Sequence, residues 1–157
     1  PMNTPPDAAT MRQAIAASRD AVAAGDRPYG AALAAPDGAV LMVERNRQHS
    51  AHDATAHAEM VLVRRAESEL GPDALRGATV YASGEPCAMC AGAMFWAGVA
   101  RVVYAAPQPA LAELLGGPVL PLRCADLLAQ AQPPVPVQSD FLAEEALAVL
   151  RDGRSGD

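Results

Sequence analysis

The stretch "EPCAMCAGAM", residues 85–94, opens an apolar run that continues to residue 100. This run is shorter than the ~20 residues that span a bilayer, and Pro86 suits a first helical turn, so we expect a buried helix here. The flanking segments 78–83 and 100–106 are short and rich in strand-forming residues, which favours a strand on each side. Two cysteines, Cys87 and Cys90, therefore lie at the start of a helix that connects two predicted strands.

Further elements extend this unit in both directions along the chain. Helical spacing of apolar residues and a turn signal at 36–38 predict the elements before it, and helices alternate with a strand after it. In chain order we expect a helix at 7–24, a β-hairpin at 30–46, a helix at 56–70, the strand–helix–strand unit at 78–106, helices near 111–115 and 124–131, an edge strand at 135–138 and a final helix at 141–150. This order predicts an α/β fold with three layers, α/β/α, around a mixed central sheet of about five strands.

Length and composition indicate one globular domain over residues 1–157, with flexible ends at about 1–6 and 152–157. The chain has a mass of 16.2 kDa, and 51% of its residues are hydrophobic while 19% are charged. Its formal charge is −6 and it contains no lysine. Binding to a nucleic acid normally requires clustered positive charge, so this composition disfavours a nucleic-acid partner.

The number of cysteines and the N-terminal sequence indicate the cellular compartment that we expect for this chain. Three cysteines, Cys87, Cys90 and Cys124, are too few and too unevenly spaced for a disulfide framework. The start of the sequence lacks a basic segment followed by an apolar run, so we expect no signal peptide. We therefore expect reduced thiols, a cytoplasmic location and no contact with a membrane.

The sequence "TAHAEM", residues 55–60, supplies the residues that complete a possible metal site. His57, Cys87 and Cys90 offer one imidazole and two thiolates, three of the four ligands of a tetrahedral Zn²⁺ ion. Glu59 lies near His57 in the first helical turn, where it can act as a proton carrier without binding the metal. The alternative is a closed structural zinc site with Cys124 as fourth ligand; otherwise Cys124 is a buried thiol.

These two motifs, His57-Ala58-Glu59 and Pro86-Cys87-x-x-Cys90, form the known signature of zinc deaminases. With "PYGAAL" at 28–33, Asn46 and "FWAG" at 95–98, the chain resembles the cytidine deaminase-like superfamily from about 28 to 105. Its guanine deaminase branch is the most similar, followed by the tRNA adenosine deaminases.

The resemblance implies a zinc-dependent aminohydrolase whose partners are a small amino-heterocycle substrate and a second copy of the chain in a homodimer. Glu59 is the implied catalytic residue, and His57, Cys87 and Cys90 are the implied metal ligands. The implied substrate-binding residues are Asn46, Ala58, Tyr29, Trp96 and Glu144.

Several features leave the substrate open. Gln108 stands where the guanine deaminases carry acidic residues, and the C-terminal segment lacks their aromatic-rich end, although Glu144 or Glu145 could bind an amidine edge. Another purine, cytosine, a nucleoside or a triazine remains an alternative to guanine, and a tRNA adenosine deaminase is the rival enzyme. The rival from another class is a zinc-stabilised binding module. Phe95 and Trp96 could equally be core residues, and His49 and His52 are expected to be solvated or hydrogen-bonded.

Overall fold

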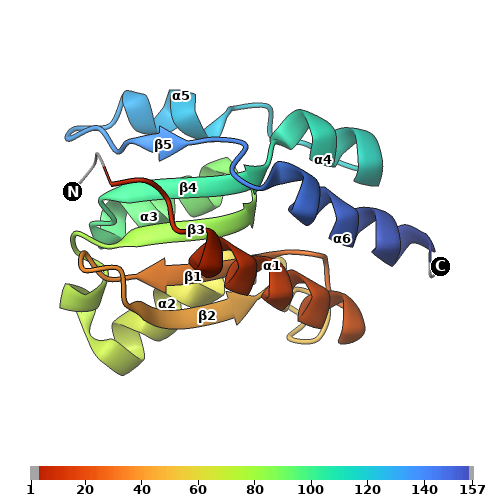
Figure 1. Cartoon of the computed structure of the whole chain (residues 1–157), viewed down its shortest axis with the longest axis horizontal. Helices are drawn as coiled ribbons and strands as arrows, with labels where there is room; N and C mark the ends of the chain where they lie inside the picture. The colour runs from red at the N-terminus through yellow and green to blue at the C-terminus, as the bar shows by residue number, and fades with distance from the viewer. Residues whose placement is uncertain (1–3, 156–157) are drawn as a thin grey trace.

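The computed structural model describes residues 4–155, which form a mixed five-stranded sheet between two layers of helices (Figure 1). The strands lie in the order β2-β1-β3-β4-β5. The pairs β1–β2 and β1–β3 are antiparallel, and the pairs β3–β4 and β4–β5 are parallel. The elements are α1 (Ala8–Ala23), β1 (Gly30–Ala34), β2 (Val40–Arg45), α2 (Ala58–Leu70), a 3-10 turn (Pro72–Ala74), β3 (Thr79–Gly84), α3 (Ala88–Ala97), β4 (Arg101–Ala106), α4 (Gln108–Leu115), α5 (Cys124–Ala129), β5 (Val137–Gln138) and α6 (Ala143–Ser155).

Two apolar clusters, one on each side of the sheet, make the core. Leu62 from α2, Met94 from α3 and Leu128 from α5 belong to one cluster, on the face that α2, α3 and α5 cover. Met11 from α1 and Leu147 from α6 belong to the other. The predicted three-layer α/β fold is therefore confirmed.

Several boundaries differ from the expected ones for local reasons. The edge strand expected at 135–138 is reduced to β5, because the neighbouring prolines at 134 and 136 have no N–H to donate to a ladder. Helix α4 begins at Gln108, with Pro109 in its first turn, and not at 111. Helix α6 extends to Ser155, beyond the expected end at 150 and into the tail expected to be flexible. Residues 1–3 and 156–157 of the expected flexible ends lie outside the described residues.

The central parallel strands position the site. Strands β3 and β4 are buried along almost their whole length because helices cover both faces of the sheet. Their carboxyl ends, Gly84 and Ala106, lead directly to the start of α3 and the start of α4. Ligands of α/β proteins bind at such carboxyl ends, so this edge of the sheet is the natural place for a site. None of the helices in residues 4–155 combines the length and apolar character needed to cross a bilayer.

Helix α1 packs against β1 with almost no space between the backbones. A Cβ atom added to Gly30 would lie 2.0 Å from the carbonyl oxygen of Ala14 and 2.8 Å from the Cβ of Ala17. The Gly30 N–H also donates to the Ser83 hydroxyl oxygen at 2.9 Å, which fixes β1 next to β3. The approach therefore requires glycine at position 30.

We predict that Gly30→Ala lowers the free energy of unfolding by about 2 kcal/mol or more, because overpacking forces α1 away from the sheet. Gly153→Ala is the matched control, since a Cβ there would make only an ordinary contact, at 3.6 Å, with Val22. The control should be neutral or slightly stabilising. Urea unfolding measures both values, and equal stability of the two variants would contradict the close packing of α1.

Candidate metal centre and active-site pocket

Two helix starts bring the three proposed metal ligands together. His57 is the N-cap of α2, and Cys87 is the N-cap of α3 with Cys90 in the first turn that follows. The His57 Nδ1 atom lies 3.6 Å from the Cys87 Sγ atom and 3.5 Å from the Cys90 Sγ atom, and the two Sγ atoms are 3.7 Å apart. The helices themselves pack against each other, so the cluster is held by the core beneath it.

These distances test whether Zn²⁺ fits the site. Zinc–sulfur bonds of about 2.3 Å and zinc–nitrogen bonds of about 2.0–2.1 Å give tetrahedral edges of about 3.8 Å between sulfurs and about 3.6 Å between sulfur and nitrogen. The observed separations match these edges closely. One imidazole and two thiols are also a donor set that Zn²⁺ prefers, so the residues fit the ion.

Cys124, which the sequence offered as a possible fourth ligand, is not part of this group. Within residues 4–155 the cluster of possible ligand atoms contains His57, Cys87 and Cys90 and does not include Cys124. The Cys124 backbone N–H donates to Glu85, and burial raises the pKa of the Cys124 thiol to about 12. The geometry therefore argues against a closed site with four protein ligands and supports a centre with three protein ligands.

The two thiols of the centre differ in acidity before metal binds. A hydrogen bond with Cys90 and a further one with His57 lower the pKa of Cys87 to about 4, against the effect of burial. The same contact with Cys87, together with burial, raises the pKa of Cys90. One thiolate is thus preformed, and metal binding must displace the proton of the other.

Glu59 is a buried carboxyl group that faces the pocket beside this centre. The residue is only 6% exposed, in the first turn of α2. Burial raises the pKa of Glu59 to about 7, with the nearby Cys87 adding to the rise and His57 opposing it. A carboxyl group with such a pKa can both accept and release a proton near neutral pH. His57 precedes the helix while Glu59 lies within it, so the two side chains approach the centre differently.

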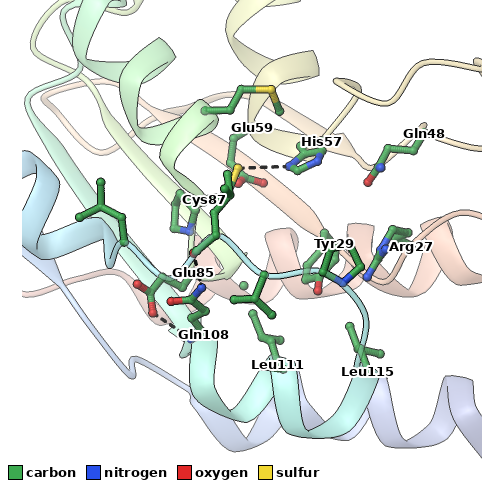
Figure 2. A pocket seen from close by; sticks show the side chains of 18 of the residues that line it. Arg27, Tyr29, Gln48, His57, Glu59, Glu85, Cys87, Gln108, Leu111 and Leu115 are labelled. Atoms are coloured by element: carbon green, nitrogen blue, oxygen red, sulfur yellow. Dashed lines mark hydrogen bonds between the residues drawn. The ribbon is translucent and has the colours of Figure 1, made fainter.

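A cavity of about 470 Å³ lies in front of these residues (Figure 2). One wall is apolar and comes from α4 and the segment 116–122, with Leu111, Leu115 and Leu120 among its members. The opposite side carries His57 and Glu59 together with the polar residues that Figure 2 labels at its far end, Arg27, Tyr29 and Gln48. Both the volume and the mainly apolar lining are typical of sites for small organic ligands.

Glu85 fastens the apolar wall to the metal centre. Its side chain is 2% exposed and accepts hydrogen bonds from the backbone N–H groups of Gln108 and Cys124 at 2.8 and 3.0 Å. The Arg123 Nε atom donates to both of its carboxylate oxygens, at 3.0 and 2.9 Å. Burial alone would raise the pKa of Glu85, but these bonds outweigh burial and lower it. One carboxylate next to Pro86 therefore holds both ends of the wall.

Of the nine site residues that the resemblance implies, the structure brings five to the centre or the pocket: Tyr29, His57, Glu59, Cys87 and Cys90. It differs from expectation for the other four, none of which lines the pocket. Asn46 is fully buried and instead holds Gln48, donating from Nδ2 to Gln48 Oε1 at 2.7 Å and accepting the Gln48 N–H at 2.9 Å.

The remaining three differ because of their positions on helices. Ala58 has a methyl group that is fully buried in the core. Trp96 is 84% exposed on α3. Glu144 is exposed on α6 and pairs with Arg151 at 3.2 Å. Neither Trp96 nor Glu144 serves the pocket within one chain.

Sequence reasoning missed several pocket residues. Arg27, Gln48, Glu85 and Met89 line the pocket and were not predicted. Arg27 and Glu85 each directly precede a recognised motif, which was the available signal. The apolar segment 116–122 carries no motif, because contacts between distant residues, such as that of the Cys124 N–H with Glu85, bring it over the site.

Comparison with known proteins gives a family. Residues 5–106 match the model described as the cytidine and deoxycytidylate deaminase zinc-binding region, and the chain belongs to this family. The family, the fold and the ligand set together define a zinc-dependent deaminase domain, as the resemblance predicted, with Zn²⁺ as its cofactor.

Individual relatives point to different substrates. A tRNA(Ile)-lysidine synthase from Deinococcus deserti is 38% identical over 143 residues, which are 90% of this chain but only 26% of that protein. A tRNA-specific adenosine deaminase from Agrobacterium fabrum is 39% identical over 99 residues, 63% of this chain and 64% of that protein. The chain therefore spans less than two thirds of the length of either relative.

Solved structures include the guanine deaminase from Nitrosomonas europaea, with 26% identity, a TM-score of 0.81, and coverage of 94% of this chain and 84% of that chain. A further neighbour was solved with 2,6-diaminopurine bound, with 27% identity, a TM-score of 0.82, and coverage of 94% and 80%. Structural neighbours of this chain thus bind small heterocycles.

We predict that Cys87→Ala abolishes stable zinc binding, because it removes one of three protein ligands. Cys124→Ala is the matched control and should retain about one zinc ion per chain, because Cys124 lies outside the ligand group. Elemental analysis after dialysis against a weak chelator measures the metal content. Loss of zinc from the Cys124 variant, with its fold intact by circular dichroism, would restore the four-ligand site.

Proposed function

We propose that this chain hydrolytically removes an exocyclic amine from a free nucleobase or related amino-heterocycle and releases ammonia, as a guanine deaminase does. The observation that carries the proposal is the position of Glu59, a buried carboxyl whose pKa is raised to about 7, beside a three-ligand zinc centre and facing a cavity of about 470 Å³. A structural metal site has no need of such a carboxyl group or of an adjoining cavity. This argument weighs against the zinc-stabilised binding module.

Zn²⁺ held by His57, Cys87 and Cys90 would supply an activated water and stabilise negative charge. Glu59 then performs the proton transfers. It accepts a proton as water adds to the amine-bearing ring carbon and delivers that proton to a ring nitrogen. The proton of the added hydroxyl group then passes through the same carboxyl group to the amine, which departs as ammonia and leaves a carbonyl on the ring.

The pocket offers few polar contacts, and these favour a flat, weakly polar ligand. The aromatic ring of Tyr29 and the side chain of Leu111 can pack against a heterocycle. The Gln48 Oε1 atom accepts the Asn46 amide, which turns the Gln48 NH₂ group toward other partners. Within residues 4–155 that NH₂ group donates no hydrogen bond, so it is free to donate to a ring nitrogen or carbonyl oxygen.

The rival substrate is a tRNA adenosine, which the name of the tRNA-specific adenosine deaminase among the relatives favours. An RNA loop would need a cationic surface around the pocket, and the chain carries a formal charge of −6 without any lysine. The apolar wall of the segment 116–122 also suits a free base better than a phosphate backbone. A free heterocycle is therefore our first proposal.

We predict that Glu59→Gln lowers kcat by about 10²- to 10⁴-fold while zinc remains bound, because the amide cannot carry protons. For the wild type, kcat/KM should fall as the pH drops below about 7, where the carboxylate form of Glu59 is lost. Glu67→Gln, on the exposed face of the same helix, is the control and should retain activity.

Ammonia release should be measured with guanine, 2,6-diaminopurine, cytosine, a triazine, nucleosides and an anticodon stem-loop. Turnover of the stem-loop alone would replace the free-base proposal with the tRNA one. No turnover of any of these compounds by the zinc-loaded chain would favour the binding module.

The chain is further proposed to act as a homodimer in the cytoplasm. Two of its three cysteines belong to the proposed zinc site, which needs thiolates, and a reducing compartment keeps thiols available. Helix α3 exposes Trp96, whose ring lies edge-to-face against Phe95 with centroids 5.0 Å apart. A large aromatic side chain left 84% exposed is typical of an interface.

We predict that Trp96→Glu converts the dimer into a monomer, because a buried charge at a symmetric contact is costly on both copies. Leu70→Glu removes another exposed apolar residue, at the end of α2, and should leave the dimer intact. Sedimentation velocity distinguishes the two states. A wild type that is monomeric at micromolar concentration would contradict the dimer.

A further inference from the structure

Arg27 is a positively charged side chain that lines the pocket. Figure 2 shows Arg27 beside Tyr29 and Gln48, on the far side of the pocket from Cys87 and Glu85. Among the described residues, no carboxylate forms an ion pair with Arg27. Most other arginines do form one, namely Arg12, Arg45, Arg47, Arg64, Arg65, Arg76, Arg123 and Arg151.

The acidic groups nearby are committed to other partners. Asp26, the preceding residue, is 7% exposed, and its Oδ1 atom accepts the N–H groups of His49 and Ser50 at 2.8 and 2.9 Å. Its Oδ2 atom accepts from the Arg45 guanidinium and the Ser50 hydroxyl, both at 2.7 Å. The charge of Arg27 is therefore not neutralised by its neighbour in the chain.

The two acids that line the pocket are also unavailable. Glu85 is held by Arg123 and two backbone N–H groups. Glu59 lies beside the metal ligands, away from Arg27 (Figure 2). Among the described residues, Arg27 is therefore left as an uncompensated positive charge at the other end of the cavity.

Arg27 is also held on a fixed backbone segment. Its carbonyl oxygen accepts the Tyr29 N–H at 2.8 Å, and the Tyr29 carbonyl oxygen accepts the Asn46 N–H at 2.9 Å. The Asp26 N–H donates to the Ala21 carbonyl oxygen of α1 at 2.8 Å. The Arg27 and Tyr29 side chains lie next to each other in the pocket (Figure 2). Burial raises the pKa of the Tyr29 hydroxyl, and the positive charge of Arg27 and a side-chain hydrogen bond with it oppose that rise.

We propose that the Arg27 guanidinium and the Tyr29 hydroxyl form an oxyanion subsite, so that the substrate is an amino-heterocycle with a carboxylate or phosphate substituent remote from its exocyclic amine. A guanidinium donates two parallel hydrogen bonds to a carboxylate or a phosphate, and the phenol can add a third. A cavity of about 470 Å³ has room for a substituent beyond a bare ring. This inference rests on the proposed deaminase function and narrows its substrate class.

The test compares ligands that differ only in the anionic group. Pterin with pterin-6-carboxylate tests a carboxylate, and guanosine with guanosine 5′-monophosphate tests a phosphate. Dissociation constants are measured by fluorescence or calorimetry on the zinc-loaded full chain carrying Glu59→Gln, so that no ligand is consumed. We expect the anionic member of at least one pair to bind about tenfold more tightly or better at low salt, and less so at high salt.

Variants identify the residue responsible for this preference. Arg27→Gln should reduce the preference to within about twofold, and Arg27→Lys should retain part of it because the charge remains. Arg19→Gln removes a charge from the exposed face of α1 and should leave the preference unchanged. Equal melting temperatures for the Gln variants exclude a folding effect.

Four results would overturn the subsite. These are equal affinity within both pairs, no binding of either anionic ligand, a preference that survives Arg27→Gln, or an Arg27→Gln effect confined to an anticodon stem-loop. Ammonia release from neutral bases without any anion preference would reject the subsite and keep the deaminase. An Arg27-dependent anion preference without ammonia release from any compound would keep the subsite and reject the deaminase function.

Discussion

Everything at this site depends on the convergence of two helix starts at the carboxyl ends of the central strands. The core between α2 and α3 places His57, Cys87 and Cys90 with their ligand atoms 3.5 to 3.7 Å apart. Those separations are close to the edges of a tetrahedron around Zn²⁺. Because the ligands lie at the starts of two helices that pack against each other, little reorganisation is needed for the ion to bind.

Two glutamates beside the metal centre have different roles because their surroundings shift their pKa values in opposite directions. Burial dominates at Glu59 and raises its pKa to about 7, so this carboxyl group can exchange protons. Glu85 is also shielded from water, but Arg123 and two backbone N–H groups lower its pKa and keep it ionised. The first carboxyl group is thus suited to proton transfer, while the second is a permanent anchor for the pocket wall.

The pocket wall explains why membership of the family leaves the substrate open. The family match ends at residue 106, whereas α4 and the segment 116–122 begin beyond it and form the apolar side of the cavity. Arg27, Tyr29 and Gln48 on the opposite side lie within the matched residues. The pocket therefore combines residues of the matched region with an apolar wall from beyond it, and the family match describes only the first of these.

The sequence alone determined the α/β class, the order of the main elements, the family and the zinc ligand set. These features follow from local patterns, because hydrophobic periodicity specifies helices and strands, and the spacing of Cys87 and Cys90 within one helical turn specifies ligands. Short elements next to prolines, such as β5 and α4, were misplaced, since local propensity does not say which backbone groups find a partner in the sheet.

Only the tertiary structure decided what surrounds the metal centre. It separated Cys124 from the ligands, moved Trp96 and Glu144 away from the pocket and gave Asn46 a supporting role behind Gln48. It also brought Arg27 and the segment 116–122 to the same cavity, although they are far apart in the chain. Such contacts arise from packing between distant segments, and the periodicity and motifs of a single sequence carry no information about them.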